Sequence, residues 1–259
     1  MAAGLSTPML DFFRRGEVAR DVRLLAAQGA IAPRPVEQLG ILVVLTSDSE
    51  AEIRETAEAT LKLLPAELLA AFIARADVPT ELREFFIKRG IAPSASPAPD
   101  SDEPLLDTDE AGLAVGATDD ETQLTFQQRL ANMTVPEKVK CATKGTREMR
   151  AILIRDPNRM VAAAVLSCPK VNEGEVEAFA KMGNVSEEIL RTIAMSRAWT
   201  KSYGVLLALV KNSKTPVALT MNMLQRLNDS DVKRISTDRN VPEALRVAAR
   251  RKVVASQSG

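Results

Sequence analysis

The sequence predicts an all-α protein, specifically a right-handed α-solenoid of short helix pairs. Three features point to it: a 28-residue repeat in the C-terminal half, few aromatic side chains (3%) and few glycines. The strands of a β-sandwich would favour aromatic and β-branched residues. With 46% hydrophobic residues among 259, the chain suits thin helical layers filled by Leu, Val, Ile, Ala and Met.

The repeat shows as columns of equivalent residues spaced by 28 without a gap. One column contains only Asp or Asn: Asp156, Asn184, Asn212 and Asn240. An apolar column follows five residues later: Val161, Ile189, Val217 and Leu245. A second apolar column lies nine residues after the Asp or Asn: Val165, Ile193, Met221 and Ala249. These columns predict a first helix in each copy, beginning near the Asp or Asn.

A second helix is predicted halfway through each copy. Its N-caps are residues whose side chains can accept a hydrogen bond from the first turn: Asn172, Thr200 and Asn228. An apolar column directly precedes them: Val171, Trp199 and Leu227. Neither helix can bury its apolar stripe alone, so successive copies are expected to stack as in a solenoid.

The N-terminal half contains a fainter copy of the pattern. The stretch that begins at Asp77 reads Asp-Val-Pro-Thr-Glu-Leu-Arg and matches Asn-Val-Pro-Glu-Ala-Leu-Arg, which begins at Asn240. Asp48 precedes Asp77 by 29 residues and has an apolar residue five positions later, as in the other copies. Helices are also predicted over 8–28 and 34–46.

Charge divides the chain into three parts. Residues 1–89 have a net charge of −2, residues 90–121 of −9 with no Lys or Arg, and residues 122–259 of +11. A proline-rich stretch with uncompensated charge and few large apolar residues cannot offset the entropy of ordering. We therefore predict an N-terminal helical repeat domain over 1–90, a disordered acidic linker over 91–121, and a basic helical repeat domain from 122 to 259.

Two stretches of the C-terminal half resemble known repeat proteins. Val210-Lys-Asn-Ser-Lys-Thr-Pro and Asp238-Arg-Asn-Val-Pro-Glu-Ala-Leu-Arg are similar to the leucine-rich repeat variant and to the broader HEAT-like bacterial α-solenoids. The resemblance covers most of 134–257 and part of 41–90, and it implies a fold more than a function. The nitrogen-fixation-associated variant protein has a cysteine cluster for an iron–sulfur centre, which this sequence lacks, so the resemblance implies no cofactor.

The residue types present argue against catalysis. The sequence has no histidine, the commonest general base and metal ligand, and no glycine-rich phosphate loop or other catalytic motif. Cys141 and Cys168 form no CxxC pair and are expected to be buried free thiols, with a redox pair as the alternative. We expect no enzymatic activity, cofactor or metal.

Localisation is predicted from two further features. The N-terminus does not show the basic and apolar segments of a signal peptide. No apolar run approaches the roughly 20 residues that are needed to cross a bilayer. We therefore expect a cytoplasmic protein that does not enter the membrane.

Two aromatic residues are candidates for partner binding. Trp199 shares its column with apolar residues, which favours packing between helices over contact with a ligand. Tyr203 shares its column with Glu175 and Asp231, which are expected to face solvent. An exposed tyrosine beside Trp199 is a candidate anchor, because Tyr and Trp are enriched in interface hot spots.

Three cations are the other candidates. Arg155, Lys211 and Arg239 occupy one column, directly before the Asp or Asn. One explanation is that they complement the dipole at the end of a helix. The other is that they form a cationic stripe along one edge of the solenoid, directed at an anionic partner.

The function expected from these features is that of a non-catalytic scaffold or adaptor that binds a protein partner on helical repeats. The alternative is nucleic-acid binding through the phosphate backbone by the basic C-terminal domain. In that case the acidic linker could fold back on the domain and compete with the nucleic acid. Neither the partner nor the oligomeric state can be read from the sequence.

Overall fold

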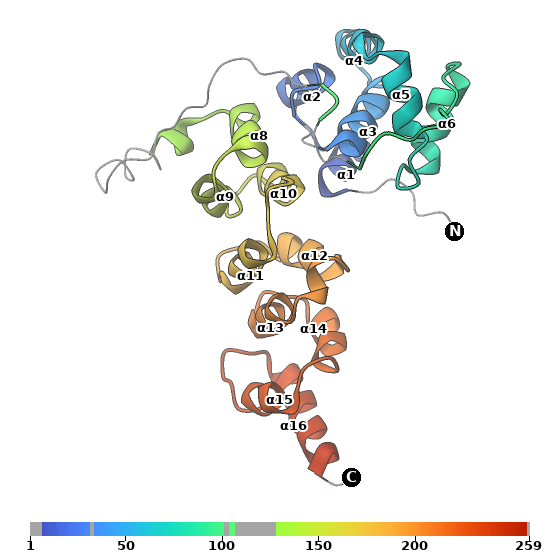
Figure 1. Cartoon of the computed structure of the whole chain (residues 1–259). Coiled ribbons are helices and arrows are strands. Elements are labelled where there is room, and N and C mark those ends of the chain that lie inside the picture. The colour runs from blue at the N-terminus through green and yellow to red at the C-terminus, as the bar shows by residue number, and fades with distance from the viewer. Residues whose placement is uncertain (1–6, 32–33, 101–103, 107–127, 258–259) are drawn as a thin grey trace. The chain divides into compact units, whose positions relative to one another are not determined.

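A computed structural model describes the chain over residues 7–31, 34–100, 104–106 and 128–257. Among these residues every regular element is a helix, which confirms the predicted all-α class (Figure 1). The chain divides into two compact units, residues 1–170 and 171–259, and each is described by itself.

The first unit begins with six helices. They are α1 (Pro8–Arg14), α2 (Arg20–Ala27), α3 (Pro35–Leu45), α4 (Ala51–Leu63), α5 (Ala66–Ile73) and α6 (Thr80–Lys88). α3 forms the core of this group: most of its side chains are buried, and it packs against α1, α2, α4 and α6. It matches the helix predicted over 34–46. The region 8–28 contains two helices, α1 and α2, and the chain turns between them at Gly16, whose φ is 68°.

Three further helices complete this unit. They are α8 (Val135–Lys144), α9 (Arg147–Leu153) and α10 (Arg159–Ser167), preceded by a helical turn over 128–132. α10 packs against α8 and α1, and every side chain from Met160 to Ser167 is buried. The division of the chain therefore falls after residue 170. The domain boundaries that we placed at 90 and 122 stay a prediction.

Part of the segment predicted as a disordered linker is held against α3 and α5. This corrects the prediction for residues 91–100 and 104–106. The backbone N–H groups of Ser94 and Ala98 donate to carbonyl groups of α5. Those of Leu105 and Leu106 donate to the side chain of Gln38. The prediction of disorder rested in part on the shortage of large apolar side chains, but these contacts are hydrogen bonds of the backbone, which do not require such side chains. The remainder of the predicted linker, 101–103 and 107–121, lies outside the described residues.

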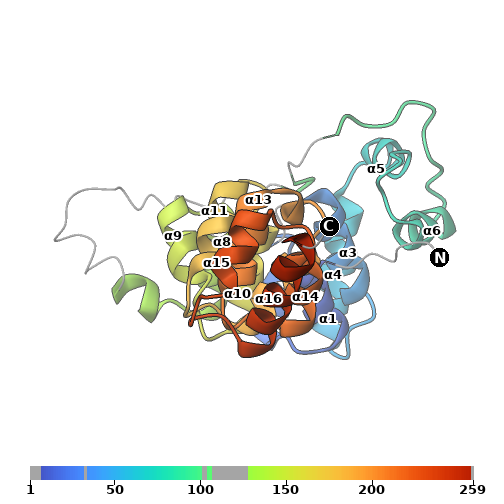
Figure 2. The same cartoon turned by 90° about the horizontal axis from the view of Figure 1, so that it is seen from below.

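The second unit contains a run of helix pairs. Its elements are α11 (Glu173–Lys181), α12 (Glu187–Met195), the 3-10 turn η1 (Trp199–Lys201), α13 (Tyr203–Lys211), α14 (Val217–Leu224), α15 (Asp229–Ile235) and α16 (Glu243–Gln257). Within this unit, Figures 1 and 2 both place α11, α13 and α15 along one side, and α14 and α16 along the other. α11 packs against α13, α13 against α14, and α16 against both α14 and α15.

Two of the three predicted N-caps are confirmed. The side chain of Asn172 accepts from the backbone N–H of Glu175 at 3.0 Å, and that of Asn228 accepts from Asp231 at 2.8 Å. The prediction for Thr200 is wrong. This residue lies in η1, where its hydroxyl donates to the carbonyl oxygen of Ser196 at 2.8 Å, and α13 begins only at Tyr203.

The starts of the helices in this copy also depart from the 28-residue spacing. Glu187 and Val217, the first residues of α12 and α14, are 30 residues apart instead of 28. As a result, α14 buries Thr220, Met223 and Leu224, while Val217 and Met221 are each 37% exposed. The other members of those two columns are buried as predicted: Val161, Ile189, Leu245, Val165, Ile193 and Ala249.

Candidate partner-binding surface

A groove lies between α11 and α13, and it contains one of the predicted site residues. Its volume is about 300 Å³, and it is lined in part by Lys181, Leu207 and Lys211. Lys181 donates to the carboxylate of Glu177 at 2.6 Å, whereas Lys211 is exposed. The lining of the groove therefore combines apolar side chains with two lysines.

Gly204 leaves room for the side chain of Glu177 in the groove. A Cβ atom at this position would lie 2.1 Å from Oε2 of Glu177. Because the obstacle is the far end of a flexible side chain, the carboxylate can move aside. Gly204 therefore explains where Glu177 rests in the groove, and a side chain here would push that carboxylate outward.

Asn212 closes one end of the groove. Its side-chain amide is buried and donates to the carbonyl oxygens of Ala180 (2.8 Å) and Met182 (3.0 Å), at the end of α11. Its Oδ1 accepts from the backbone N–H of Lys214 at 3.0 Å. A helix was predicted to begin near each Asp or Asn of this column, and α14 begins at Val217. Asn212 itself tightens the loop before α14 and ties that loop to the end of α11.

The same turn recurs elsewhere in the chain. Oδ1 of Asp48 accepts from the N–H two residues later, and so does Oδ1 of Asp156. In the last copy Asp238 takes this role in place of Asn240, by accepting from the Asn240 N–H at 2.9 Å. Asn and Asp favour such turns because their short side chains reach the backbone two residues on.

Tyr203 is partly exposed, at 42%, but it is tied to the next helix pair. Its hydroxyl donates to the carboxylate of Asp231 on α15 and accepts from the backbone N–H of Asn228. Burial raises the pKa of the Tyr203 phenol, and the nearby Asp231 raises it further. The expectation that Glu175 and Asp231 face solvent is wrong: they are 2% and 7% exposed.

Trp199 occupies the first position of η1 and is half-buried. It thus lies four residues before Tyr203, at the start of the turn that leads into α13. Neither aromatic residue is fully buried, so both present part of their rings on the surface of the second unit. Whether they contact a partner stays a prediction.

The three cations of the predicted stripe are all exposed, but they do not share one environment. Nε of Arg155 donates to the carbonyl oxygen of Ala151 at 3.0 Å, which is the interaction expected of a cation at a helix end. Lys211 is the last residue of α13, and Arg239 lies in the loop before α16. Arg155 belongs to the first unit and the other two to the second, so a continuous stripe stays a prediction.

One surface of the second unit was not predicted from the sequence. α14 reads Val-Ala-Leu-Thr-Met-Asn-Met-Leu and is the only helix of the second unit without a charged residue. Its outward side chains include Val217 and Met221, and on α12 the side chain of Met195 is 70% exposed. The signal that could have revealed it is the absence of charge from a helix whose neighbours all carry charge.

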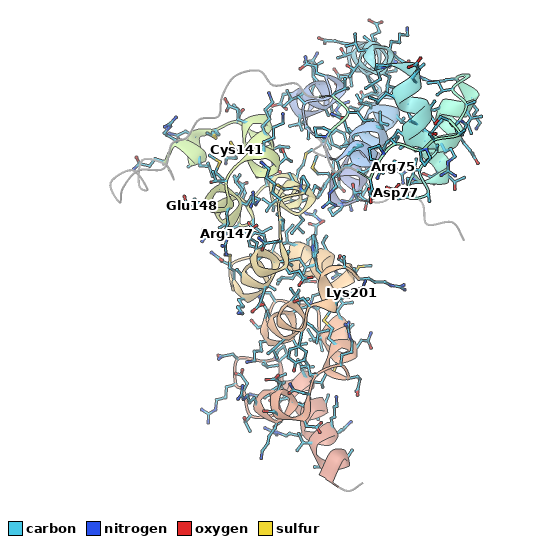
Figure 3. All side chains as sticks on the ribbon, viewed as in Figure 1. Arg75, Asp77, Cys141, Arg147, Glu148 and Lys201 are labelled. Carbon is cyan, nitrogen blue, oxygen red and sulfur yellow. The ribbon has the colours of Figure 1, made fainter. Side chains whose placement is uncertain are left out.

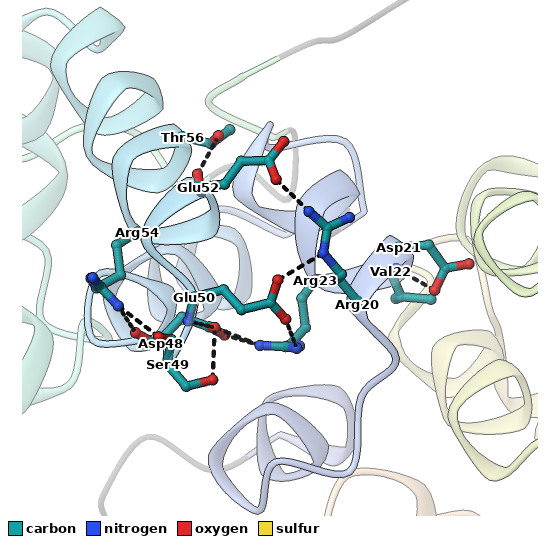
Figure 4. A network of polar contacts seen from close by, with 10 residues as sticks. All are labelled: Arg20, Asp21, Val22, Arg23, Asp48, Ser49, Glu50, Glu52, Arg54 and Thr56. Atoms are coloured by element: carbon teal, nitrogen blue, oxygen red, sulfur yellow. Dashed lines mark hydrogen bonds and ion pairs between the residues drawn. The ribbon is translucent and has the colours of Figure 1, made fainter.

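A dense group of charges in the first unit serves the fold. Arg23 pairs with Asp48 and Glu50, and Arg20 pairs with Glu50 and Glu52, so that α2 is tied to the start of α4 (Figure 4). The hydrogen bonds from Arg23 hold the pKa of Asp48 below its usual value, against the opposing effect of burial. These acids also lie at the N-terminus of α4, where the helix dipole favours negative charge.

The described part of the chain offers no geometry for metal chemistry. Within it, no three Cys, Asp or Glu side chains come together as ligands for an ion. Cys141 and Cys168 are free and buried, as predicted, and Cys168 Sγ donates to the carbonyl oxygen of Thr143 at 3.0 Å (Figure 3 labels Cys141). Burial raises the pKa of the Cys141 thiol, which disfavours the reactive thiolate.

Comparison with protein-family models, curated proteins and solved structures finds no match to this chain. Among the described residues, no helix has both the length and the apolar character needed to span a membrane.

Proposed function

We propose that this protein is a non-catalytic scaffold that binds a protein partner, and that the partner contacts α14 in the second unit. In this proposal the helix pairs of this unit stack as a right-handed α-solenoid. The resemblance to HEAT-like and leucine-rich repeat variant proteins supports the repeat architecture, and repeat stacks present long surfaces to their partners.

The observation that carries the proposal is the uncharged surface of α14. A helix that remains in water normally has charged or polar residues on its outward face. α14 has no charged residue, and its outward Val217 and Met221 are each 37% exposed. Apolar side chains grouped on one exposed face are typical of a protein contact site.

The alternative is that the basic residues bind nucleic acid. Exposed Lys211, Lys214 and Arg239 favour it, and so does the net charge of +11 over residues 122–259. The binding of phosphates must weaken steeply as salt rises. Fluorescence anisotropy of a labelled duplex and a labelled single strand, at low and moderate salt, therefore separates the two functions. Salt-sensitive binding in which the K211Q/K214Q variant is weaker would replace the scaffold proposal.

The scaffold proposal is tested with a photo-cross-linking amino acid at Met221 of the full-length chain. The control carries the same amino acid at Lys233, an exposed position on α15. We expect a discrete protein adduct from position 221 and none from 233. The partner identified in this way is then titrated against purified variants.

The deciding measurement is the affinity of that partner for two double variants. V217S/M221Q removes the apolar face, and we expect at least about tenfold weaker binding, as for a small hot spot. S230A/K233Q changes two exposed residues of α15 and should bind like the unaltered protein. Equal binding by both variants would mean that the partner does not use α14, and the proposal would be dropped.

A further inference from the structure

We propose that α2, α3 and α4 of the first unit form a binding site for an acidic peptide with two adjacent leucines, and that residues 104–106 occupy this site as a tethered internal ligand. An external partner with the same chemistry would displace them. The inference concerns a different unit from α14 and does not rest on the function proposed for that helix.

Gln38 is the centre of the site. It lies on α3 and is 2% exposed. Its Oε1 accepts from the backbone N–H groups of Leu105 (3.0 Å) and Leu106 (3.1 Å). Its Nε2 donates to the carbonyl oxygens of Leu106 (3.0 Å) and Gly29 (2.8 Å). One side-chain amide thus satisfies three backbone groups of a segment that bends at Leu105 and Leu106.

The side chain of Leu106 fills the space above Gly29. A Cβ atom on Gly29 would lie 2.9 Å from Cδ1 of Leu106 and 3.5 Å from Cγ2 of Thr60 on α4. Gly29 also has a φ of 79°, a conformation that other residues rarely adopt. The absence of a side chain here leaves room for a leucine, so the site selects an aliphatic residue at this position.

A second contact lies near the end of α5 and binds an acidic residue. Arg75 is 7% exposed and donates to the carboxylate of Asp100 and, at 3.1 Å, to the carbonyl oxygen of Pro99. It also pairs with Asp77, which lies beside it (Figure 3). The hydrogen bonds to Asp77 are the main cause that raises the pKa of Arg75. An arginine side chain is always charged in proteins. The preferred ligand therefore has an acid several residues before its leucines.

The recognised segment has the properties of a ligand rather than of a core element. Residues 104–106 form no helix, and their side chains are only half-buried. Most of their contacts run through the backbone, which another sequence with leucines could reproduce. If the segment left without a replacement, the amide of Gln38 would exchange three of its four hydrogen bonds for bonds to water. A ligand that supplies the same backbone groups would restore them.

The test uses the full-length chain with L105S/L106S, which removes both leucine side chains and so weakens the internal ligand. The probe is a fluorescent peptide with the sequence of residues 100–110, Asp-Ser-Asp-Glu-Pro-Leu-Leu-Asp-Thr-Asp-Glu. We expect the variant to bind it at least about tenfold more tightly than the unaltered chain, because a tethered ligand competes at an effective concentration on the order of millimolar. Far-UV circular dichroism confirms that the variant is folded.

Two altered peptides test the geometry without changing the protein. In one, both leucines are serine, and in the other the backbone nitrogen of Leu106 is methylated, which removes a donor to Gln38. Each should bind the L105S/L106S chain at least about tenfold more weakly than the parent peptide, as for a lost anchor contact. Equal binding of all three peptides, or no binding at millimolar concentration, would overturn the proposal.

A second measurement applies if the L105S/L106S chain does not fold. The unaltered chain is titrated with millimolar peptide while the side-chain amide resonance of Gln38 is followed by NMR. The parent peptide should shift this resonance, and the methylated peptide should leave it in place. A resonance that neither peptide moves would show that residues 104–106 are a permanent part of the fold. V217S/M221Q should behave like the unaltered chain, so this result is separate from the test of α14.

Discussion

The region α8–α10 of the first unit and the region α13–α14 of the second are built on the same repeat, yet they bury it differently. Val161 of α10 and Val217 of α14 occupy the same column, 56 residues apart. Val161 is fully buried, because α10 lies between α1 and α8. Val217 is 37% exposed, because α14 packs against α13 and α16 on one side and leaves the opposite face open.

The difference shows that an apolar column predicts a helix but not its burial. Whether a side chain is covered depends on the number of helices around it, and those come from distant parts of the sequence. α10 is covered by α1, more than a hundred residues earlier in the chain. The comparison can be tested by making matched changes in the two regions and measuring the free energy of unfolding in urea by circular dichroism.

The largest expected effect comes from adding one methyl group at Gly145, and the same change at Gly204 is the matched control. A Cβ on Gly145 would lie 2.2 Å from the backbone oxygen of Cys141, which cannot move without bending α8. We expect Gly145→Ala to lower the free energy of unfolding by about 3 kcal/mol, as for overpacking. Gly204→Ala meets only the flexible carboxylate of Glu177 and should cost less than about 1 kcal/mol. Equal costs would contradict the distinction between backbone and side-chain obstacles.

Matched valine truncations test burial directly. Val161→Ala removes two buried methyl groups and leaves a cavity, so we expect a loss of about 2 kcal/mol. Val217→Ala on exposed α14 should change stability by less than about 0.5 kcal/mol. A loss at Val217 as large as that at Val161 would mean that α14 is covered by another part of the protein, and the outward face would not be free for a partner.

A pH-dependent effect is expected next to the end of α10. Glu37 is 2% exposed and accepts from the hydroxyl groups of Thr7 and Ser167. Burial raises the pKa of its carboxyl group above the usual value; the two hydroxyls oppose this, as does Arg34, while Asp11 reinforces it. Stability from this group is therefore fully present below the unfolded-state pKa of about 4.3 and is lost as pH rises through the folded-state pKa.

Glu37→Gln should remove this dependence, because glutamine stays neutral. Within that window the unaltered chain should lose up to about 1.4 kcal/mol per pH unit relative to the variant. The difference is measured by urea unfolding at several pH values from about 4 to about 9. This range includes the unfolded-state pKa of about 4.3. Parallel stability curves for the two proteins would show that Glu37 has the same pKa in both states. α13 and α14 contain no Asp or Glu, so we expect no comparable pH dependence from these two helices.

The smallest expected effect concerns the Asp or Asn column. Asn212→Ala removes two hydrogen bonds to the end of α11 and one within its own loop, so we expect a loss of about 1–2 kcal/mol. Asn184→Ala changes an exposed member of the same column and should cost less than about 0.5 kcal/mol. The single tryptophan, Trp199, lies in this unit and provides a fluorescence signal for both variants. Similar losses would mean that the column acts through backbone conformation alone.

The features that could be predicted from the sequence are those that depend on neighbours within a few residues. The caps at Asn172 and Asn228 were predictable because the bonded groups are three residues apart. The Thr200 cap failed because a competing 3-10 turn, with its own hydrogen bond to Ser196, occupies the same residues. Of the candidate site residues, Tyr203 and Lys211 could be placed on a helix, but the bond from Tyr203 to Asp231 could not.

The class of fold, the positions of most helices and the free state of the two cysteines followed from composition, apolar spacing and capping residues alone. The burial of Val161 against the exposure of Val217, and the contact of Gln38 with Leu105 and Leu106, required the tertiary structure. The physical reason is separation: these contacts join residues far apart in the chain, and no local pattern states which distant segment will cover a given face. In this protein the two candidate binding surfaces are both of that kind.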